Sequence, residues 1–201
     1  MPKLRDETYA ARRQHIVDAA RTCFARNGFD ATSMADLQRA AGVSTGALYV
    51  YFPRKSDLVD AVIDGSIAFF ATICAETASG PLPLRDALAR LLARIDQDAT
   101  GPAAGIGFQL WAESVRDKHL ARRLRRAARS TSADFTRLVE RAVAAGELPP
   151  GTDTAEAGRA IYRAAFGFYA HRIVAGGDRP RAVADSIVRA LRAEPAATIA
   201  A

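Results

Sequence analysis

The chain has 201 residues, 49% of them hydrophobic and 25% charged, which excludes a disordered or fibrous protein and allows one or two small domains. Its formal net charge is +6, and residues 1–55 hold nine Lys/Arg against five Asp/Glu, so 9 − 5 = +4 of that excess lies in the first quarter of the chain. This distribution favours an anionic partner for the N-terminal segment.

The first predicted helix covers residues 9–27 and ends before a glycine. Within it, Ile16, Ala20 and Phe24 recur at four-residue spacing and give one buried stripe. Residues 1–9 are polar and charged, and we expect them to form a mobile arm that precedes this helix.

A short helix that ends in a tight turn is predicted next. Ser33 and Asp36 have the Ser-x-x-acid spacing of a capped helix start. Leu37 and Ala41 then fall one turn apart on a single face. Gly42 can take the positive φ that closes a helix C-terminus.

A second short helix follows, with Ser44 as its cap and with Leu48 and Phe52 facing inward. Two short helices around a glycine-containing turn are the helix-turn-helix arrangement, whose second helix enters the DNA major groove. The small residues at its start let backbone N–H groups and the positive end of the helix dipole approach phosphate. Tyr49 and Tyr51 either reach phosphates or cover a small core, and we expect a DNA contact for at least one of them.

After Pro53, apolar periodicity continues to the end of the chain without any alternating β pattern. We therefore predict an all-α protein of about nine helices, with a frayed tail from about residue 194. The six helices expected after Pro53 cover residues 55–78, 84–98, 103–114, 117–145, 153–174 and 180–193.

Enzymatic and metal sites are not predicted. The chain has no HExxH, CxxC, GxGxxG or P-loop spacing, and its three histidines fall on different predicted helices. Cys23 and Cys74 are expected as buried structural thiols. The arginine-rich stretch 122–129 lacks interleaved aromatic residues and is expected to be a solvated helix face. We predict no catalytic residue, no cofactor and no metal, and a cytoplasmic protein without a membrane span.

The stretch Gly42–Phe52 followed by Lys55 resembles the recognition region of the tetracycline-repressor (TetR) family. Phe24 and residues 28–29 and 32–34 resemble that family's first helix and its exit. The resemblance covers residues 12–58, a little over a quarter of the chain, and its pattern is dense. It departs from the family at Gln38, where a small residue is common, and at Arg54, where a small capping residue commonly opens the fourth helix.

The resemblance implies a DNA-binding domain over residues 1–53 and a domain for dimerisation and ligand binding over residues 54–201. The helix over 55–78 would connect the two domains and be their main mechanical link. The last two helices would pair across a two-fold axis to give a homodimer on a palindromic double-stranded DNA operator. We expect Thr45 and Gly46 to approach bases, and the full set of residues expected at DNA is Thr32, Ser33, Ser44, Thr45, Gly46, Ala47, Tyr49, Tyr51 and Lys55.

The resemblance also implies a small-molecule pocket inside the C-terminal domain. Aromatic walls with few polar groups are typical of such pockets and also of an ordinary core, and both interpretations stay open for each residue. The residues expected to line the pocket are Phe70, Phe108, Trp111, Tyr162, Phe166 and Tyr169, with Gln109, Glu113 and His171 as scattered polar groups.

We therefore predict a regulator of transcription, a repressor that an effector of unknown identity releases from its operator. Two other classes stay open. One is a regulator that works without a small molecule, and the other is a small-molecule-binding protein with a vestigial DNA-binding module.

Overall fold

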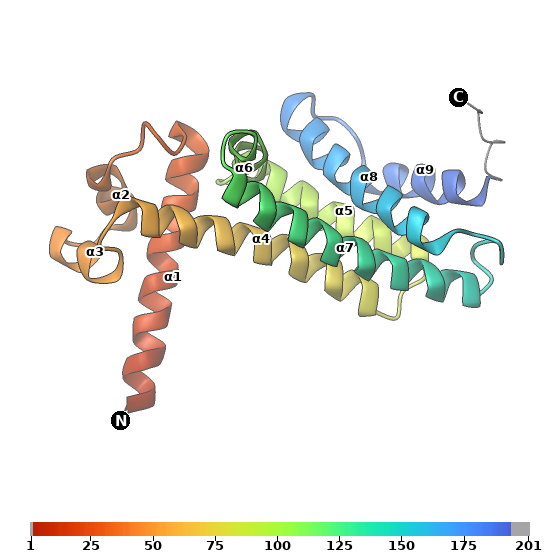
Figure 1. Ribbon diagram of the computed structural model, residues 1–201, viewed down its shortest axis with the longest axis horizontal. Helices are drawn as coiled ribbons and strands as arrows, with labels where there is room; N and C mark the ends of the chain where they lie inside the picture. The colour runs from red at the N-terminus through yellow and green to blue at the C-terminus, as the bar shows by residue number, and fades with distance from the viewer. Residues whose placement is uncertain (1, 194–201) are drawn as a thin grey trace.

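A computed structural model describes the chain over residues 2–193, with side chains from residue 8 onward (Figure 1). In this range the regular structure consists of nine helices without a strand, which confirms the predicted all-α class. The helices are α1 (Pro2–Asn27), α2 (Met34–Ala41), α3 (Thr45–Tyr51), α4 (Lys55–Ser79), α5 (Leu84–Thr100), α6 (Ile106–Ser114), α7 (Lys118–Ala144), α8 (Thr154–Val174) and α9 (Pro180–Arg192).

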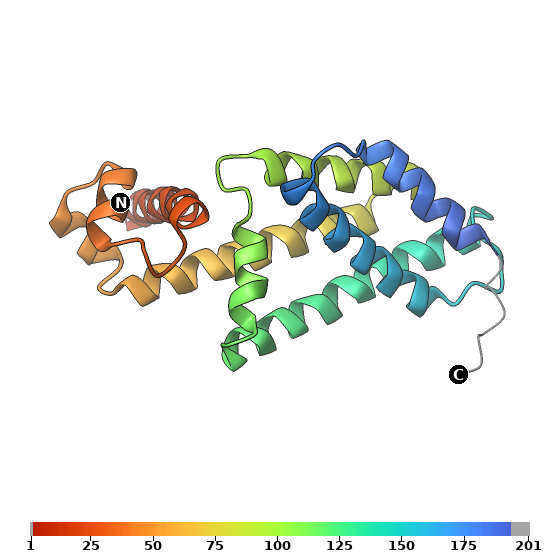
Figure 2. The same cartoon turned by 90° about the horizontal axis from the view of Figure 1, so that it is seen from above.

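The helices form two groups that α4 joins. In Figure 1, α1, α2 and α3 lie at one end of the molecule, and α4 runs from them into the second group, where α7 and α9 extend beyond its end. Figure 2 shows α6 crossing between the two groups, with α5, α7, α8 and α9 on its far side. An N-terminal helix-turn-helix unit followed by a larger helical domain is therefore confirmed.

The first core fills the space between α1, α2, α3 and the start of α4. Phe24, Leu48 and Phe52 are fully buried there. Leu58 of α4 and Ile106 of α6 belong to the same core, although both lie beyond the predicted boundary at residue 53. The residue boundary of the domains thus stays a prediction, because this core takes side chains from both sides of it.

The second core lies between α4, α5, α7, α8 and α9 and includes Leu91, Phe135 and Ile161. Helices α7 and α8 approach closely at Gly158. A Cβ built on this glycine would lie 2.7 Å from the backbone nitrogen of Thr136, so only a residue without a side chain fits.

Helix α4 also has the length and hydropathy of a membrane span, with a mean hydropathy of 1.8, and it is the one helix in residues 2–193 that does. Length and composition alone are weak evidence for a membrane span, because a core helix has the same properties. Leu58 and Val62 of α4 are buried in the first core, and Ile73 and Cys74 are buried in the second.

Two local expectations need correction or detail. Residues 2–9 do not precede the first helix as a separate arm but form the first turns of α1, which begins with Pro2. Proline is well suited to the first helical position because its fixed φ matches the helix and its missing N–H is not needed there. Within the arginine-rich stretch, Arg123 bonds to Asp60 and Asp64 of α4, whereas its neighbours Arg122 and Arg125 are exposed.

We expect Gly158→Ala to lower the free energy of unfolding by about 1–3 kcal/mol, because the added methyl forces α7 and α8 apart. Urea unfolding followed by circular dichroism measures the change. Gly65→Ala is the matched control, since Gly65 is an exposed helical glycine with no atom within 4 Å of an added Cβ. It should be neutral or stabilise by up to ~1 kcal/mol. Equal losses at both positions would contradict the packing argument.

Candidate functional site

Helix α2 carries the caps that the sequence predicts at both of its ends. Ser33 caps α2: its Oγ accepts from the Asp36 backbone N–H at 3.2 Å, and its own N–H donates to Asp36 Oδ2 at 3.0 Å. Gly42 ends α2 with φ +61°. Gln38 donates through Nε2 to the Val43 carbonyl at 2.9 Å, so this departure from the family pattern stabilises the turn.

Helix α3 presents an exposed surface that begins at its capped N-terminus. The Ser44 hydroxyl oxygen accepts from the Ala47 backbone N–H at 3.2 Å, and Leu48 faces the core. Thr45 and Gly46 are exposed, and no atom lies within 4 Å of a Cβ built on Gly46.

The outer face of α3 continues through Tyr49, which is 46% exposed, and Val50, which is 70% exposed. Sequence reasoning missed Val50. Its signal was available, because Val50 follows Gly46 by four residues, about one helical turn, and lies away from the buried Leu48.

Two of the residues expected at DNA, Thr32 and Tyr51, have side chains that are buried or half-buried. Thr32 is 1% exposed and its hydroxyl donates to the Gly28 carbonyl at 2.7 Å. Its side chain therefore holds the turn before α2 and does not lie on the surface as we expected. Tyr51 is half-buried, with its ring stacked on Tyr9 at 4.6 Å between centroids, so its position depends on α1.

The start of α4 follows α3 after a three-residue link. Lys55 contacts the loop between α1 and α2, where its Nζ donates to the Asp30 carbonyl at 3.1 Å. Arg54 offers no capping oxygen, and Asp57 takes over by accepting from the Arg54 N–H at 3.1 Å and from its guanidinium at 2.7 Å. The Arg54 side chain, by donating these bonds, holds the pKa of the Asp57 carboxyl below its usual range.

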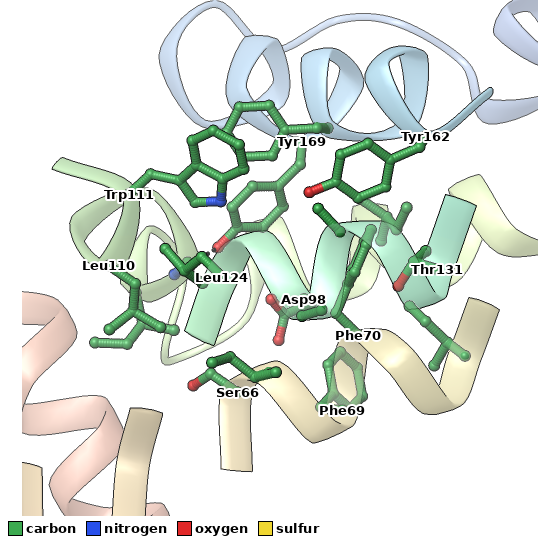
Figure 3. A pocket seen from close by; sticks show the side chains of 18 of the residues that line it. Ser66, Phe69, Phe70, Asp98, Leu110, Trp111, Leu124, Thr131, Tyr162 and Tyr169 are labelled. Atoms are coloured by element: carbon green, nitrogen blue, oxygen red, sulfur yellow. Dashed lines mark hydrogen bonds between the residues drawn. The ribbon is translucent and has the colours of Figure 1, made fainter. Parts of the chain in front are cut away.

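A cavity of about 100 Å³ lies among α4, α5, α6, α7 and α8 (Figure 3). Five of the six residues that we expected in a pocket line it: Phe70, Trp111, Tyr162, Phe166 and Tyr169. Phe108 does not; it lies on another face of α6 and is 44% exposed. The remaining lining residues are Arg21, Ser66, Ile67, Phe69, Ile73, Ile95, Asp98, Ile106, Gly107, Leu110, Leu124, Ala127, Ala128 and Thr131.

Aromatic rings form the walls of this cavity. The Trp111 and Phe166 ring centroids are 4.1 Å apart, and Phe70 meets Tyr162 edge to face at 6.4 Å. Figure 3 shows the side chains of Trp111, Tyr169 and Tyr162 on one side of the cavity and those of Phe69 and Phe70, from α4, on the other. Trp111 is 39% exposed, so it marks an open edge of the cavity.

The polar groups at the cavity differ from those expected. The Gly107 backbone N–H donates to the Tyr169 hydroxyl oxygen at 3.3 Å. Burial raises the pKa of Tyr169 and of Tyr162, so both phenols stay neutral at physiological pH. Gln109 is not at the cavity: its Nε2 donates to the Ala25 carbonyl of α1 at 2.9 Å. His171 lies outside it as well, 3.2 Å from Asp178.

Arg21 and Asp98 are the two ionisable side chains, other than the tyrosines, that line the cavity. They bond to each other, and Arg21 comes from α1. Sequence reasoning missed both, because a lone arginine on a predicted helix carries no signal of a pocket more than seventy residues away.

Among residues 2–193 no three His, Cys, Asp or Glu side chains are grouped to hold a metal ion. Burial raises the pKa of the Cys74 thiol well above its usual range, so this thiol stays protonated and unreactive.

Comparison with known proteins identifies two matching families along the chain. Residues 16–62 match "Bacterial regulatory proteins, tetR family", and residues 82–191, more than half of the chain, match "Tetracyclin repressor-like, C-terminal domain".

Two curated relatives illustrate the extent of the sequence similarity. The transcriptional repressor Rv1474c of Mycobacterium tuberculosis is 43% identical over 58 residues, which is 29% of this chain but only 31% of that protein. The transcriptional regulator UidR of Escherichia coli K12 is 26% identical over 162 residues, which cover 79% of this chain and 80% of that protein.

Solved structures share the whole architecture. GusR of Salmonella enterica superposes with a TM-score of 0.72 and 26% identity, covering 90% of this chain and 93% of that one. FadR of Bacillus subtilis, solved in complex with stearoyl-CoA, superposes with a TM-score of 0.67 and 19% identity, covering 90% and 97%. With both of its segments matched in sequence and the entire fold matched in space, this chain belongs to the tetR family of bacterial regulatory proteins.

Proposed function

We propose that this chain is a ligand-responsive transcriptional repressor that an effector releases from a palindromic operator. One observation carries the proposal: an aromatic cavity lies beside α4, the helix that follows α3 after a three-residue link and whose first turns are buried in the same core as α3. A ligand at the cavity and DNA at α3 would therefore act on the same rigid element. The cavity argues against a regulator without an effector, and the intact caps of α2 and α3 argue against a vestigial DNA-binding module.

For the DNA face, we propose that α3 enters the major groove with its N-terminus foremost. Thr45 and Gly46 would approach bases, and Tyr49 and Lys55 would position the phosphate backbone. Ser33 and Ser44 act through the caps that aim these backbone N–H groups, and Ala47 and Tyr51 support the helix from its inner side. For Thr32 only the backbone is available to DNA, since its side chain is buried.

We expect Gly46→Ala to leave the fold intact and to weaken DNA binding about tenfold or more, because the free protein has room for a methyl but a closely approaching base does not. Selection of genomic fragments by the wild type identifies the operator, and fluorescence anisotropy measures affinity. Gly65→Ala is the matched control and should bind as the wild type does. If selection recovers no inverted repeat, the proposed function is wrong.

The proposed dimer pairs α8 and α9 with the same helices of a second copy. The larger apolar residues of α8, such as Ile161 and Phe168, are buried within one subunit and are not available for this pairing. The exposed face instead carries Gly167 between Arg163 and His171, with half-buried Ala164 and Ala170 beside it and with Val174, which is 78% exposed. Small residues permit close approach of helices, so we propose that Gly167 lies at the two-fold seam.

We expect Gly167→Gln to convert the dimer to a monomer while the fold becomes no less stable. No atom lies within 4 Å of a Cβ at Gly167, and glutamine is a better helix former than glycine by ~0.5–1 kcal/mol. Light scattering at micromolar concentration gives the mass. Gly65→Gln makes the same change at an exposed position of α4, and this variant should remain dimeric. A monomeric wild type would overturn the proposed pairing.

The effector site that we propose is the aromatic cavity. FadR of Bacillus subtilis holds stearoyl-CoA in its solved complex, and it shares this architecture. Rings on α4 and on α8 face each other across the cavity, so an occupant that spreads them would displace α4. A coupling of about 1–3 kcal/mol would weaken DNA binding roughly 5–150-fold.

We expect Trp111→Phe to change the dissociation constant of any effector that releases operator DNA, while the ligand-free affinity for DNA stays within about twofold. Effector binding should also change the fluorescence of Trp111, the single tryptophan of the chain. Phe108→Leu is the matched control: this aromatic residue is on the same helix but outside the cavity. Equal shifts for both variants would place the effector elsewhere.

A further inference from the structure

One ion pair at the cavity joins the DNA-binding segment to the C-terminal domain. Arg21, on the C-terminal half of α1, donates through Nη2 to Oδ1 of Asp98 on α5. The Arg21 guanidinium carbon also lies 5.6 Å from the centroid of the Phe69 ring on α4. Both charged side chains line the cavity, so its polar corner is made by two domains together.

This pair is incompletely satisfied. The Nε atom of Arg21 is buried and has no hydrogen-bond partner, so the guanidinium holds Asp98 with one donor and not with the parallel pair that Arg–carboxylate contacts commonly form. A buried donor without an acceptor costs free energy, and the contact is correspondingly easy to exchange.

The two partners would not respond equally to being separated. The Arg21 side chain is 25% exposed and can carry its charge into solvent on a long flexible stem, whereas the Asp98 side chain is 16% exposed and fixed on α5. Leaving Asp98 unpaired would strand a largely buried carboxylate, which is strongly unfavourable. Any occupant of this corner that displaces Arg21 must therefore bring a positive charge of its own.

The rest of the cavity also suits a cation. An anionic occupant would meet the carboxylate of Asp98 as a like charge. The aromatic faces favour a positive group, and the Phe69 ring already lies next to one in Arg21. The remaining wall, around Trp111, Phe166 and Ile73, offers apolar surface for the body of the ligand.

Resting on the proposed function, we propose that the effector is a small aromatic or apolar molecule with a cationic head, which replaces Arg21 on Asp98. In doing so it detaches α1 from α5. Because α1 packs against α2 and positions Tyr51 through Tyr9, the exchange changes how the DNA-binding segment is held. The ion pair is thus both the recognition site for the charge of the ligand and the switch that reports its binding.

The test uses three probes that differ in charge. Benzylguanidinium carries the head group of Arg21 on an aromatic body, benzylurea is its neutral counterpart, and phenylacetate is an anion of similar size. Isothermal titration of the full-length protein should show benzylguanidinium binding about tenfold or more tightly than either of the others. Asp98→Asn should abolish this preference.

Asp96→Asn is the matched control for the carboxylate. Asp96 lies two residues away on α5 and bonds to Arg172 of α8, with both side chains 26% exposed, but this pair lies within the C-terminal domain and outside the cavity. The preference for the cation should survive in this variant. Thermal unfolding of each variant shows whether a loss of binding comes from a loss of fold.

Arg21→Gln separates recognition from switching. Without its competitor, Asp98 should bind benzylguanidinium several-fold more tightly than in the wild type. The probe should lower the affinity of the wild type for its selected operator but should leave that of Arg21→Gln unchanged.

Tighter binding of phenylacetate, a cation preference that persists in Asp98→Asn, or no binding of benzylguanidinium at millimolar concentration would overturn this inference. A fourth result, in which binding follows Asp98 but operator affinity never changes, would overturn the switch alone, since the proposed function fails only when selection recovers no operator. Release of DNA by a neutral or anionic ligand would leave the proposed function intact and refute only the charge assignment.

Discussion

Burial of the two ends of α4 in two different cores is the constraint on which the rest of this structure depends. Leu58 and Val62 complete the core of the helix-turn-helix segment, and Ile73 and Cys74 complete the core of the larger domain. Burying a large aliphatic side chain contributes ~1.5–3 kcal/mol, so each end of the helix is firmly held. Helix α4 is therefore part of both cores, and a tilt of the helix in one core changes its orientation in the other.

Helix α4 is nevertheless not the only mechanical link, although it is the only covalent one. The far end of α1 contacts the C-terminal domain through Arg21 with Asp98 and through Gln109 with the Ala25 carbonyl. Ile106 of α6 inserts into the first core. The cavity lies between these contacts and α4, so an occupant has two routes by which to act on the DNA-binding segment. Polar contacts exchange partners more readily than packed cores do, which makes the α1 contacts the adjustable part.

Around α3, one set of side chains makes the hydrogen bonds that hold the caps and the turn, and another set is exposed at the surface. The helix caps use the polar side-chain atoms of Ser33, Asp36 and Ser44 in hydrogen bonds. The Thr32 hydroxyl donates to the Gly28 carbonyl. Thr45 and Gly46 have no such task and remain exposed. The capped turn before α3 fixes the position of Thr45 and Gly46 without hydrogen bonds to the Thr45 side chain, so both residues stay available for a contact.

The sequence by itself determined the helices, their caps and the recognition region, because these follow from interactions within a few residues: the capping box at Ser33, the positive φ of Gly42 and the four-residue repeat from Ile16 to Phe24. Only the tertiary structure decided which aromatic side chains enclose a cavity. Phe108 and Trp111 are three residues apart on one helix, and only the packing of α6 on its neighbours turns Trp111 inward and Phe108 away. The same holds for Arg21 and Asp98, which are separated by 77 residues and meet because two cores fix α1 against α5.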